Sequence, residues 1–373
     1  MAKTGVTYLP LHGGKAPRWL FKRMVKLSEQ IANVLLYEYG KEELLSRLSN
    51  PYWFQALSCV LGYDWHSSGT TTVTCAALKE AIDPEKHGFA LVGGKGKTSR
   101  KTPAEIKQKA EIYNLSSFCI NKLTHASKMT AKIDSAAIQD YYSLYHHVFF
   151  FTEQGDWGVI QQGMNENNHY ARRYHWFSKQ IKHFCCEPNT NIVGDHFEES
   201  VLNMTSQKSK SAQQLSLDLI NDNPYHLKRD WTKLTLDTSQ RTLENWDEPI
   251  QKKTSLNSLH MPRTINWKKM KELYEFQPNN YEELLSLEGV GQNTVRALAL
   301  ISDLIYGEPP SWKDPVKFSF TVGGKDGVPF PVDTKAMDES IIQIENLLNQ
   351  ANIEKNQKIH ALRRLQTFSK VPN

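Results

Sequence analysis

The chain has 373 residues, of which 39% are hydrophobic and 10% aromatic, so it is long enough for two domains and can bury a substantial core. Its net charge of +5 is too small to indicate a polyanionic partner by itself. No apolar run has the length of a transmembrane helix or the pattern of a signal peptide, and the five cysteines form no CxxC pair. We therefore expect a cytoplasmic protein with reduced thiols that does not bind membranes.

The N-terminal residues 4–17 predict a short strand and a glycine-rich loop, followed by an amphipathic helix from about Trp19 to Tyr39. Within the loop, His12 and Lys15 could bind a phosphate together with backbone amides. The spacing differs from that of a P-loop, so a nucleotide triphosphate site is not expected. A plain turn between strand and helix is the alternative.

A polar turn bounded by glycines follows at residues 62–70, ahead of a helix expected over 71–81. Asp64 and His66 lie in this turn and could act as an acid–base pair or bind a metal. The alternative is a turn in which Asp and Ser side chains bond to the local backbone.

Positive charge is concentrated between Leu91 and Ile133, where nine Lys or Arg residues stand against two acidic residues, a local excess of seven. Such a segment is typical of phosphate binding, because cations release the counterions of a nucleic acid. Glycines beside these cations allow close approach of a strand. A solvated loop is the alternative. The candidate contacts in the glycine-rich part are Lys95, Lys97, Arg100 and Lys101.

Two strands are expected over 148–152 and 157–162, joined by a short loop that favours an antiparallel pair. A metal-dependent nuclease centre is one interpretation of this region, since hard and imidazole ligands precede the second strand. That strand ends in two glutamines, however, where such nucleases carry a carboxylate-x-lysine motif, and His146 and His147 should point to opposite sides. The candidate ligands are Asp134, Asp140, Glu153 and His146.

The segment Tyr170–Trp176 mixes cations with aromatics, as single-strand binders do, or else forms a buried aromatic face with solvated arginines. Beyond it the composition becomes polar. We therefore expect an N-terminal α+β domain over 1–203, a linker with some helices over 204–262, and a helical domain over 263–373.

The helical domain contains a predicted helix-hairpin-helix. Asn280 can cap the first helix, and Gly289 and Gly291 allow a tight turn before a second helix that starts near Gln292. The first amides of that helix, with its dipole, suit a phosphate and read the backbone of a nucleic acid rather than its bases. An ordinary αα-hairpin is the alternative. Candidate contacts are Gly289, Gly291, Asn293, Thr294 and Arg296.

Several runs together resemble a largely archaeal family known as domain of unknown function 763. They cover most of the chain apart from the polar linker, but the family name implies no function. The matching runs are Leu9–Lys15, Asp64–Gly69, Gly93–Lys97, Asp134–Ala137, Gln161–Met164 and Arg296–Ser302.

The C-terminal third also resembles the helix-hairpin-helix DNA glycosylase superfamily, through Gly289-Val290-Gly291 and the later Pro331-Val332-Asp333-Thr334. The resemblance implies that the hairpin grips DNA and that Asp333 stabilises cationic charge on the sugar as a flipped base departs. Asn293 stands where the enzymes with lyase activity have a lysine, so either there is no lyase step or another lysine serves it. Asp333 could instead simply cap the helix that follows.

We therefore expect a mainly helical α+β protein that binds DNA, with RNA as a possible partner, and hypothesise base excision in DNA repair without a cofactor. A second hypothesis is a structure-specific nuclease that uses a divalent metal at Asp64, His66, Asp134 and Asp140. A third is a non-catalytic DNA- or RNA-binding partner of a repair or processing complex.

Overall fold

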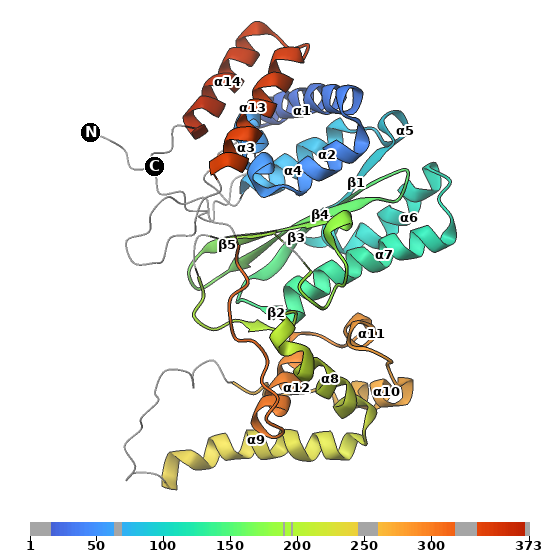
Figure 1. Cartoon of the computed structure of the whole chain (residues 1–373), viewed down its shortest axis with the longest axis vertical. Coiled ribbons are helices and arrows are strands. Elements are labelled where there is room, and N and C mark those ends of the chain that lie inside the picture. The colour runs from blue at the N-terminus through green and yellow to red at the C-terminus, as the bar shows by residue number, and fades with distance from the viewer. Residues whose placement is uncertain are drawn as a thin grey trace, which may run out of the picture.

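The computed structural model describes residues 16–62, 69–188, 191–194, 197–244, 260–317 and 334–369. In Figure 1 a layer of helices lies above a β-sheet, and further helices lie beneath it and extend downward. The expected mainly helical α+β fold with a small antiparallel sheet is confirmed.

Five strands in the described residues form one antiparallel sheet with the order β1-β3-β4-β5-β6. The expected strand pair is confirmed, and His147 of β3 faces Gln161 of β4 across the ladder. Side chains alternate in β3, so that Phe149 and Phe151 pack below the sheet and Val148 and Phe150 above it. The strands are β1 (Phe89–Lys95), β3 (Ser143–Thr152), β4 (Trp157–Asn165), β5 (Tyr170–Phe177) and β6 (Asn191–Val193). A separate small ladder pairs β2 (Ile138–Gln139) with β7 (Leu202–Asn203).

The upper helices cover one face of the sheet (Figure 1). The first of them buries Met24, Leu27, Ile31 and Leu35, which recur every three or four residues as one face of a helix requires. These helices are α1 (Arg18–Glu38), α2 (Gly40–Ser49), α3 (Pro51–Leu61), α4 (Gly69–Ala81) and α5 (Pro84–His87).

The last two helices, α13 (Thr334–Gln350) and α14 (Lys355–Ser369), belong to the same upper layer. They pack against α3, with Leu347 and Leu365 completely buried in its core. The domain division expected from the sequence grouped them with the hairpin in residues 263–373. In the structure that range is divided between the two ends of the molecule.

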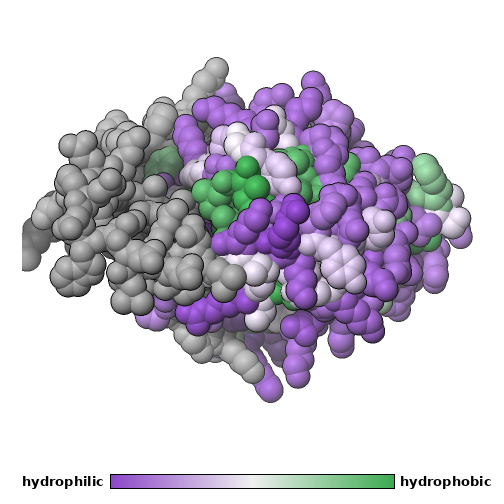
Figure 2. Space-filling view, turned by 90° about the horizontal axis from the view of Figure 1, so that it is seen from below, coloured by the Kyte–Doolittle hydropathy of each residue, from purple (hydrophilic) through white to green (hydrophobic). Residues whose placement is uncertain are grey.

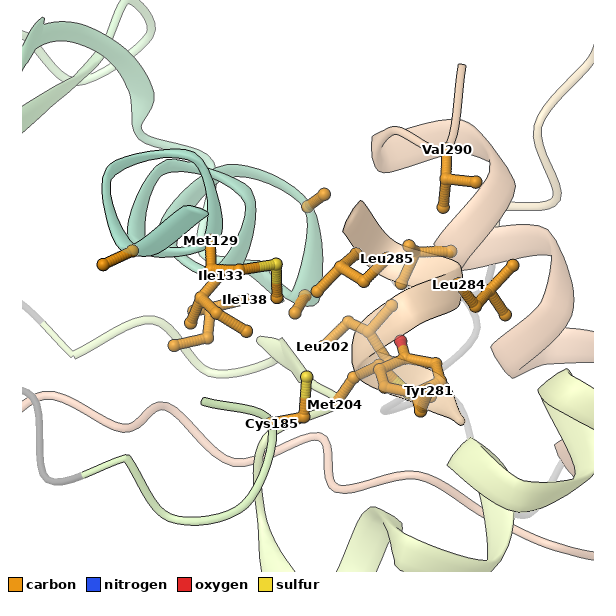
Figure 3. Close-up of a cluster of buried hydrophobic side chains, with 14 of the residues drawn as sticks. Met129, Ile133, Ile138, Cys185, Leu202, Met204, Tyr281, Leu284, Leu285 and Val290 are labelled. Carbon is orange, nitrogen blue, oxygen red and sulfur yellow. The ribbon is translucent and has the colours of Figure 1, made fainter. Parts of the chain in front are cut away.

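The lower helices share a second core that starts under the sheet. Met129 and Ile133 point toward Leu285 of the predicted hairpin (Figure 3), and full burial of such a leucine contributes about 1.5–3 kcal/mol. The expected linker contributes to this core as well, because α8 buries Leu219 and Ile220. The lower elements are α6 (Thr102–Ile112), α7 (Ser117–Lys132), the π-helical turn η2 (Ile133–Ala137), α8 (Lys210–Asn221), α9 (Pro224–Glu244), α10 (Trp267–Phe276), α11 (Tyr281–Ser286) and α12 (Gln292–Leu304).

Seen from below, the described surface is mostly hydrophilic, and its hydrophobic residues gather in small separate areas (Figure 2). Among the helices in the described ranges, none combines the length and the apolar character needed to cross a membrane.

Candidate nucleic-acid interface

Five of the predicted site residues lie outside the described residues. They are the candidate catalytic residues Asp64, His66 and Asp333, together with His12 and Lys15 of the N-terminal loop. The described part of the site comprises the basic loop, the hairpin and what lies between them.

The bend between α11 and α12, residues 287–291, has the geometry that the sequence predicts at its first glycine. Gly289 has a φ of +83°, and an added Cβ would meet the side chain of Lys269. Gly291 differs, because its backbone is extended and open space surrounds its Cα, so other residues would fit there. Asn280 caps α11 by accepting a hydrogen bond from the amide of Glu283 at 2.8 Å.

The first turn of α12 leaves its backbone amides available. Gly291 precedes the helix without a side-chain cap, and the amides of Gln292, Asn293 and Thr294 have no acceptor within the described part of the chain. The side chains of Gln292 and Asn293 are exposed. Together with the helix dipole, these amides form a surface suited to an anion.

The carbonyl groups of the same bend are occupied by donors from other elements. The ammonium of Lys132, at the end of α7, donates to the carbonyl oxygens of Leu287 and Val290. The amide of Gln139 donates to the carbonyl oxygen of Gln292 at 2.9 Å. These contacts fix the bend against the sheet-bearing part of the chain without using its amides.

Two predicted contact residues of α12 take part in the packing of the fold. Thr294 is buried, and its hydroxyl lies 3.5 Å from the carbonyl oxygen of Gly289. Arg296 donates to the carbonyl oxygen of His260 at 3.1 Å and to the side chain of Gln139 at 3.2 Å, and burial lowers its pKa. Their side chains therefore stabilise the lower helices, and the backbone amides remain the part of the bend that is available to an anion.

The basic loop follows β1 and forms a short 3-10 turn, η1 (Gly96–Lys101). All four of its predicted contact residues are exposed. Gly93 must be glycine, because its φ is +88° and an added Cβ would lie 2.3 Å from the carbonyl oxygen of His147. The ammonium of Lys95 lies 5.6 Å from the centre of the Tyr145 ring. The helix that follows the loop, α6, begins at Thr102.

A groove of about 1080 Å³ connects the basic loop to the bend. The basic loop contributes Arg100 to its lining, and the bend and the start of α12 contribute Gly291 and Gln292. One wall is α7, which contributes Lys128 and Lys132, and the other contains the residues that lead from β2 into β3. Lys97 and Lys101 lie on the same loop and Lys95 is the last residue of β1, but these three lysines do not line the groove. The aromatic residues of the groove are Tyr141, Tyr142 and Tyr145.

The lysines of the groove could have been found in the sequence. Thr124, Lys128, Ala131 and Ser135 are spaced by three or four residues, so they form one face that runs along α7 and continues into η2, and all four line the groove. Because this face combines a charged side chain with small ones, it indicates a surface that does not pack against another element of the fold. The nearby tyrosines gave no comparable signal.

The carboxylates proposed for a metal centre are used inside the protein. Asp140 accepts from Arg172 at 3.1 Å and from the hydroxyl of Tyr174 at 2.7 Å. Asp134 is completely buried, and burial raises its pKa well above the ordinary value. No group of three or more His, Cys, Asp or Glu residues in the described ranges could hold a metal ion.

The two adjacent histidines face opposite sides of the sheet, as expected. His147 meets Ser127 of α7, whereas His146 lies beside a separate cavity of about 350 Å³ on the α4 side. Burial lowers the pKa of His146 to about 3 and that of His147 to about 4, so both are neutral near pH 7. Glu153, the remaining proposed ligand, pairs with Lys41 at 2.5 Å.

The cations of β5 are buried, which neither interpretation of that segment anticipated. Arg172 donates to Asp314 at 2.5 Å, and its guanidinium lies over the ring of Tyr142. Arg173 donates to the side chain of Gln55 at 3.0 Å. Both arginines organise the core and are not available to a nucleic acid.

A mainly helical α+β protein with a cation-lined groove is thus the class that the fold defines. The chain belongs to the family described as protein of unknown function DUF763, whose model matches residues 5–332. No curated protein and no solved structure matches the chain.

Proposed function

We propose that the protein binds nucleic acid, with DNA as the first candidate and RNA as the alternative, in the groove between the basic loop and the α11–α12 bend. The observation that carries this proposal is that Arg100 and Lys128 line the same groove as Gly291 and Gln292, which adjoin amides that have no acceptor among the described residues. Two kinds of group that can bind phosphate, cationic side chains and helix amides, are therefore available in one groove.

The aromatic side chains favour bases that are not fully stacked in a duplex. Tyr141 is 47% exposed beside the groove, and Tyr145 lies under the ammonium of Lys95. Base stacking on a tyrosine is tolerant of sequence and contributes about 1–3 kcal/mol per base. We therefore expect single-stranded or distorted DNA to bind more tightly than a regular duplex.

Base excision at Asp333 remains a hypothesis that depends on the C-terminal resemblance, because this residue lies outside the described residues. The metal-nuclease hypothesis is weaker, since Asp134 and Asp140 are both buried and both accept hydrogen bonds from other side chains. Neither the base-excision hypothesis nor the metal-nuclease hypothesis establishes a role in repair or processing. Such a role is to be tested once binding of nucleic acid has been measured.

The proposal is tested by fluorescence anisotropy with labelled single-stranded and duplex oligonucleotides over a series of salt concentrations. Charge reversal at Arg100 or Lys128 should weaken binding to every sequence and reduce the slope of log K against log salt by about 1. Lys107→Glu is the matched control, because Lys107 is an exposed lysine of the same basic segment that does not line the groove. Equal effects of all three substitutions would argue against the groove.

A further inference from the structure

A chain of hydrogen bonds runs from the groove into the core. The hydroxyl of Ser127 lies 2.9 Å from Nε2 of His147, whose Nδ1 lies 2.9 Å from Oε1 of Gln161. Nε2 of Gln161 then lies 2.6 Å from the carboxylate of Asp134. Three of these residues, Ser127, His147 and Gln161, line the groove. The chain is assembled from α7, β3, β4 and η2.

The direction of each hydrogen bond follows from the amide at its centre. Nε2 of Gln161 has two acceptors, the carboxylate of Asp134 and the carbonyl oxygen of Thr130 at 3.3 Å. The amide oxygen of Gln161 therefore faces His147 and must accept, so Nδ1 carries the proton. This leaves the lone pair of Nε2 for the hydroxyl of Ser127, which is the arrangement of a nucleophile and its general base.

The residues around Ser127 and His147 keep the imidazole neutral and in this orientation. Burial lowers the pKa of His147 to about 4, so the ring is neutral near pH 7 and the lone pair of Nε2 faces the hydroxyl of Ser127. The same carboxylate oxygen of Asp134, Oδ2, also accepts a hydrogen bond from the indole of Trp176 at 2.7 Å. This fixes the far end of the chain, and Gln161 in turn fixes the orientation of the imidazole.

We propose that Ser127 is a nucleophile and His147 its general base, acting on a phosphodiester held in the groove. The choice of a phosphodiester rests on the proposed function, because Arg100 and Lys128 line the same groove as Ser127 and would bind the phosphate oxygens. Gln161 and Asp134 are positioning residues, since they act through the imidazole.

The reaction balances in two steps. The Ser127 oxygen forms a bond to phosphorus while the bond to one sugar oxygen breaks, and the hydroxyl proton passes to Nε2 of His147 and then to the departing sugar oxygen. Water next attacks the phosphoserine, gives its proton to Nε2, and the bond between phosphorus and the serine oxygen breaks. The proton returns to Ser127. The net change is hydrolysis, with no oxidant or reductant.

A fluorophosphonate probe tests the nucleophile without any nucleic acid. Treatment of the full chain should form a bond between the Ser127 oxygen and phosphorus with loss of fluoride, located by peptide mass mapping. Ser127→Ala and His147→Gln should abolish this labelling. Ser117→Ala should not, because Ser117 is an exposed serine of the same helix α7 that does not line the groove. The mapping on the wild-type chain decides the question even if a variant fails to fold.

The substrate class is tested by incubating labelled oligonucleotides with the protein in EDTA and following the products on gels. We expect cleavage that His147→Gln lowers by about 10²–10⁴-fold, and that Ser117→Ala leaves unchanged. Binding of oligonucleotides without cleavage, together with no fluorophosphonate labelling at Ser127, would overturn this inference and leave the binding proposal intact. Labelling at Ser127 with cleavage of carboxylic esters only would overturn the phosphodiester assignment.

Discussion

Lys132 donates a hydrogen bond to the carbonyl oxygen of Leu287 at 3.2 Å, across 155 residues of sequence. This contact joins the end of α7 to the α11–α12 bend and gives the Leu287 carbonyl a second donor besides the amide of Val290, which lies 3.4 Å away. The bend is therefore held in place by the same helix that lines the groove. Its position depends on the part of the chain that contains the sheet.

We predict that Lys132→Met lowers the free energy of unfolding by about 1.5–3 kcal/mol, since the change removes hydrogen bonds from a charged donor to carbonyls in a half-buried setting. The measurement is urea denaturation followed by circular dichroism. Lys128→Met, one turn earlier and exposed, should change stability by less than about 0.5 kcal/mol. Equal stability of the two variants would mean that Lys132 does not hold the bend.

The backbone amides of α12 can be tested one at a time. Gln292→Pro removes the amide at the first helical position, where proline is tolerated, and the extended Gly291 before it is compatible with proline. We expect weaker oligonucleotide binding with unchanged thermal stability. Gln292→Ala, which keeps the amide, is the control and should bind like the wild-type protein. If the proline variant also binds normally, that amide does not contact the ligand.

Arg172 should be essential to the stability of the core. Arg172→Met leaves the carboxylates of Asp140 and Asp314 buried without their cation, and loss of one partner of a buried pair costs about 3–5 kcal/mol. Chemical denaturation measures this loss, with the exposed Arg100→Met as the control. A loss of less than about 1 kcal/mol would show that these carboxylates do not depend on Arg172.

Features that depend only on neighbouring residues can be predicted from the sequence. The positive φ of Gly289, the cap of α11 at Asn280 and the period of α1 all follow from local backbone chemistry. Contacts between residues far apart in the sequence cannot be predicted in this way. Arg172 and Asp314 are 142 residues apart, and nothing in either segment indicates that they meet.

The same limit applies to helices and to the groove. Apolar periodicity shows that α13 has a face to bury, but it does not show that this face packs on α3. The Ser127, His147 and Gln161 cluster was equally hidden, because its members come from a helix and two strands. Gln161 even counted against a site in the sequence, since glutamine replaces the carboxylate expected there.

Acid should destabilise the protein partly through His147. The unfolded histidine binds a proton below about pH 6.5, whereas the folded one stays neutral until about pH 4. Within that window the unfolded state binds more protons, so the stability from this group is complete above about pH 6.5 and is lost as the pH falls. The loss amounts to roughly 3 kcal/mol.

The difference in unfolding free energy between the wild-type protein and His147→Gln isolates this effect. As the pH is lowered from about 7 to about 4, the variant should gain stability relative to the wild-type protein by up to roughly 3 kcal/mol. His183→Gln, at an exposed histidine, is the control and should run parallel to the wild-type protein. A parallel curve for His147→Gln would mean that His147 titrates normally.

Photocrosslinking tests the location of the nucleic-acid site most directly. A single-stranded oligonucleotide with 4-thiothymidine is irradiated with the full chain at low salt, and the attached peptides are identified by mass spectrometry. We predict attachment within η1, α7, the residues leading into β3, and the first turn of α12. Attachment confined to the helices α1–α5 on the opposite face of the sheet, or no attachment at all, would contradict the account.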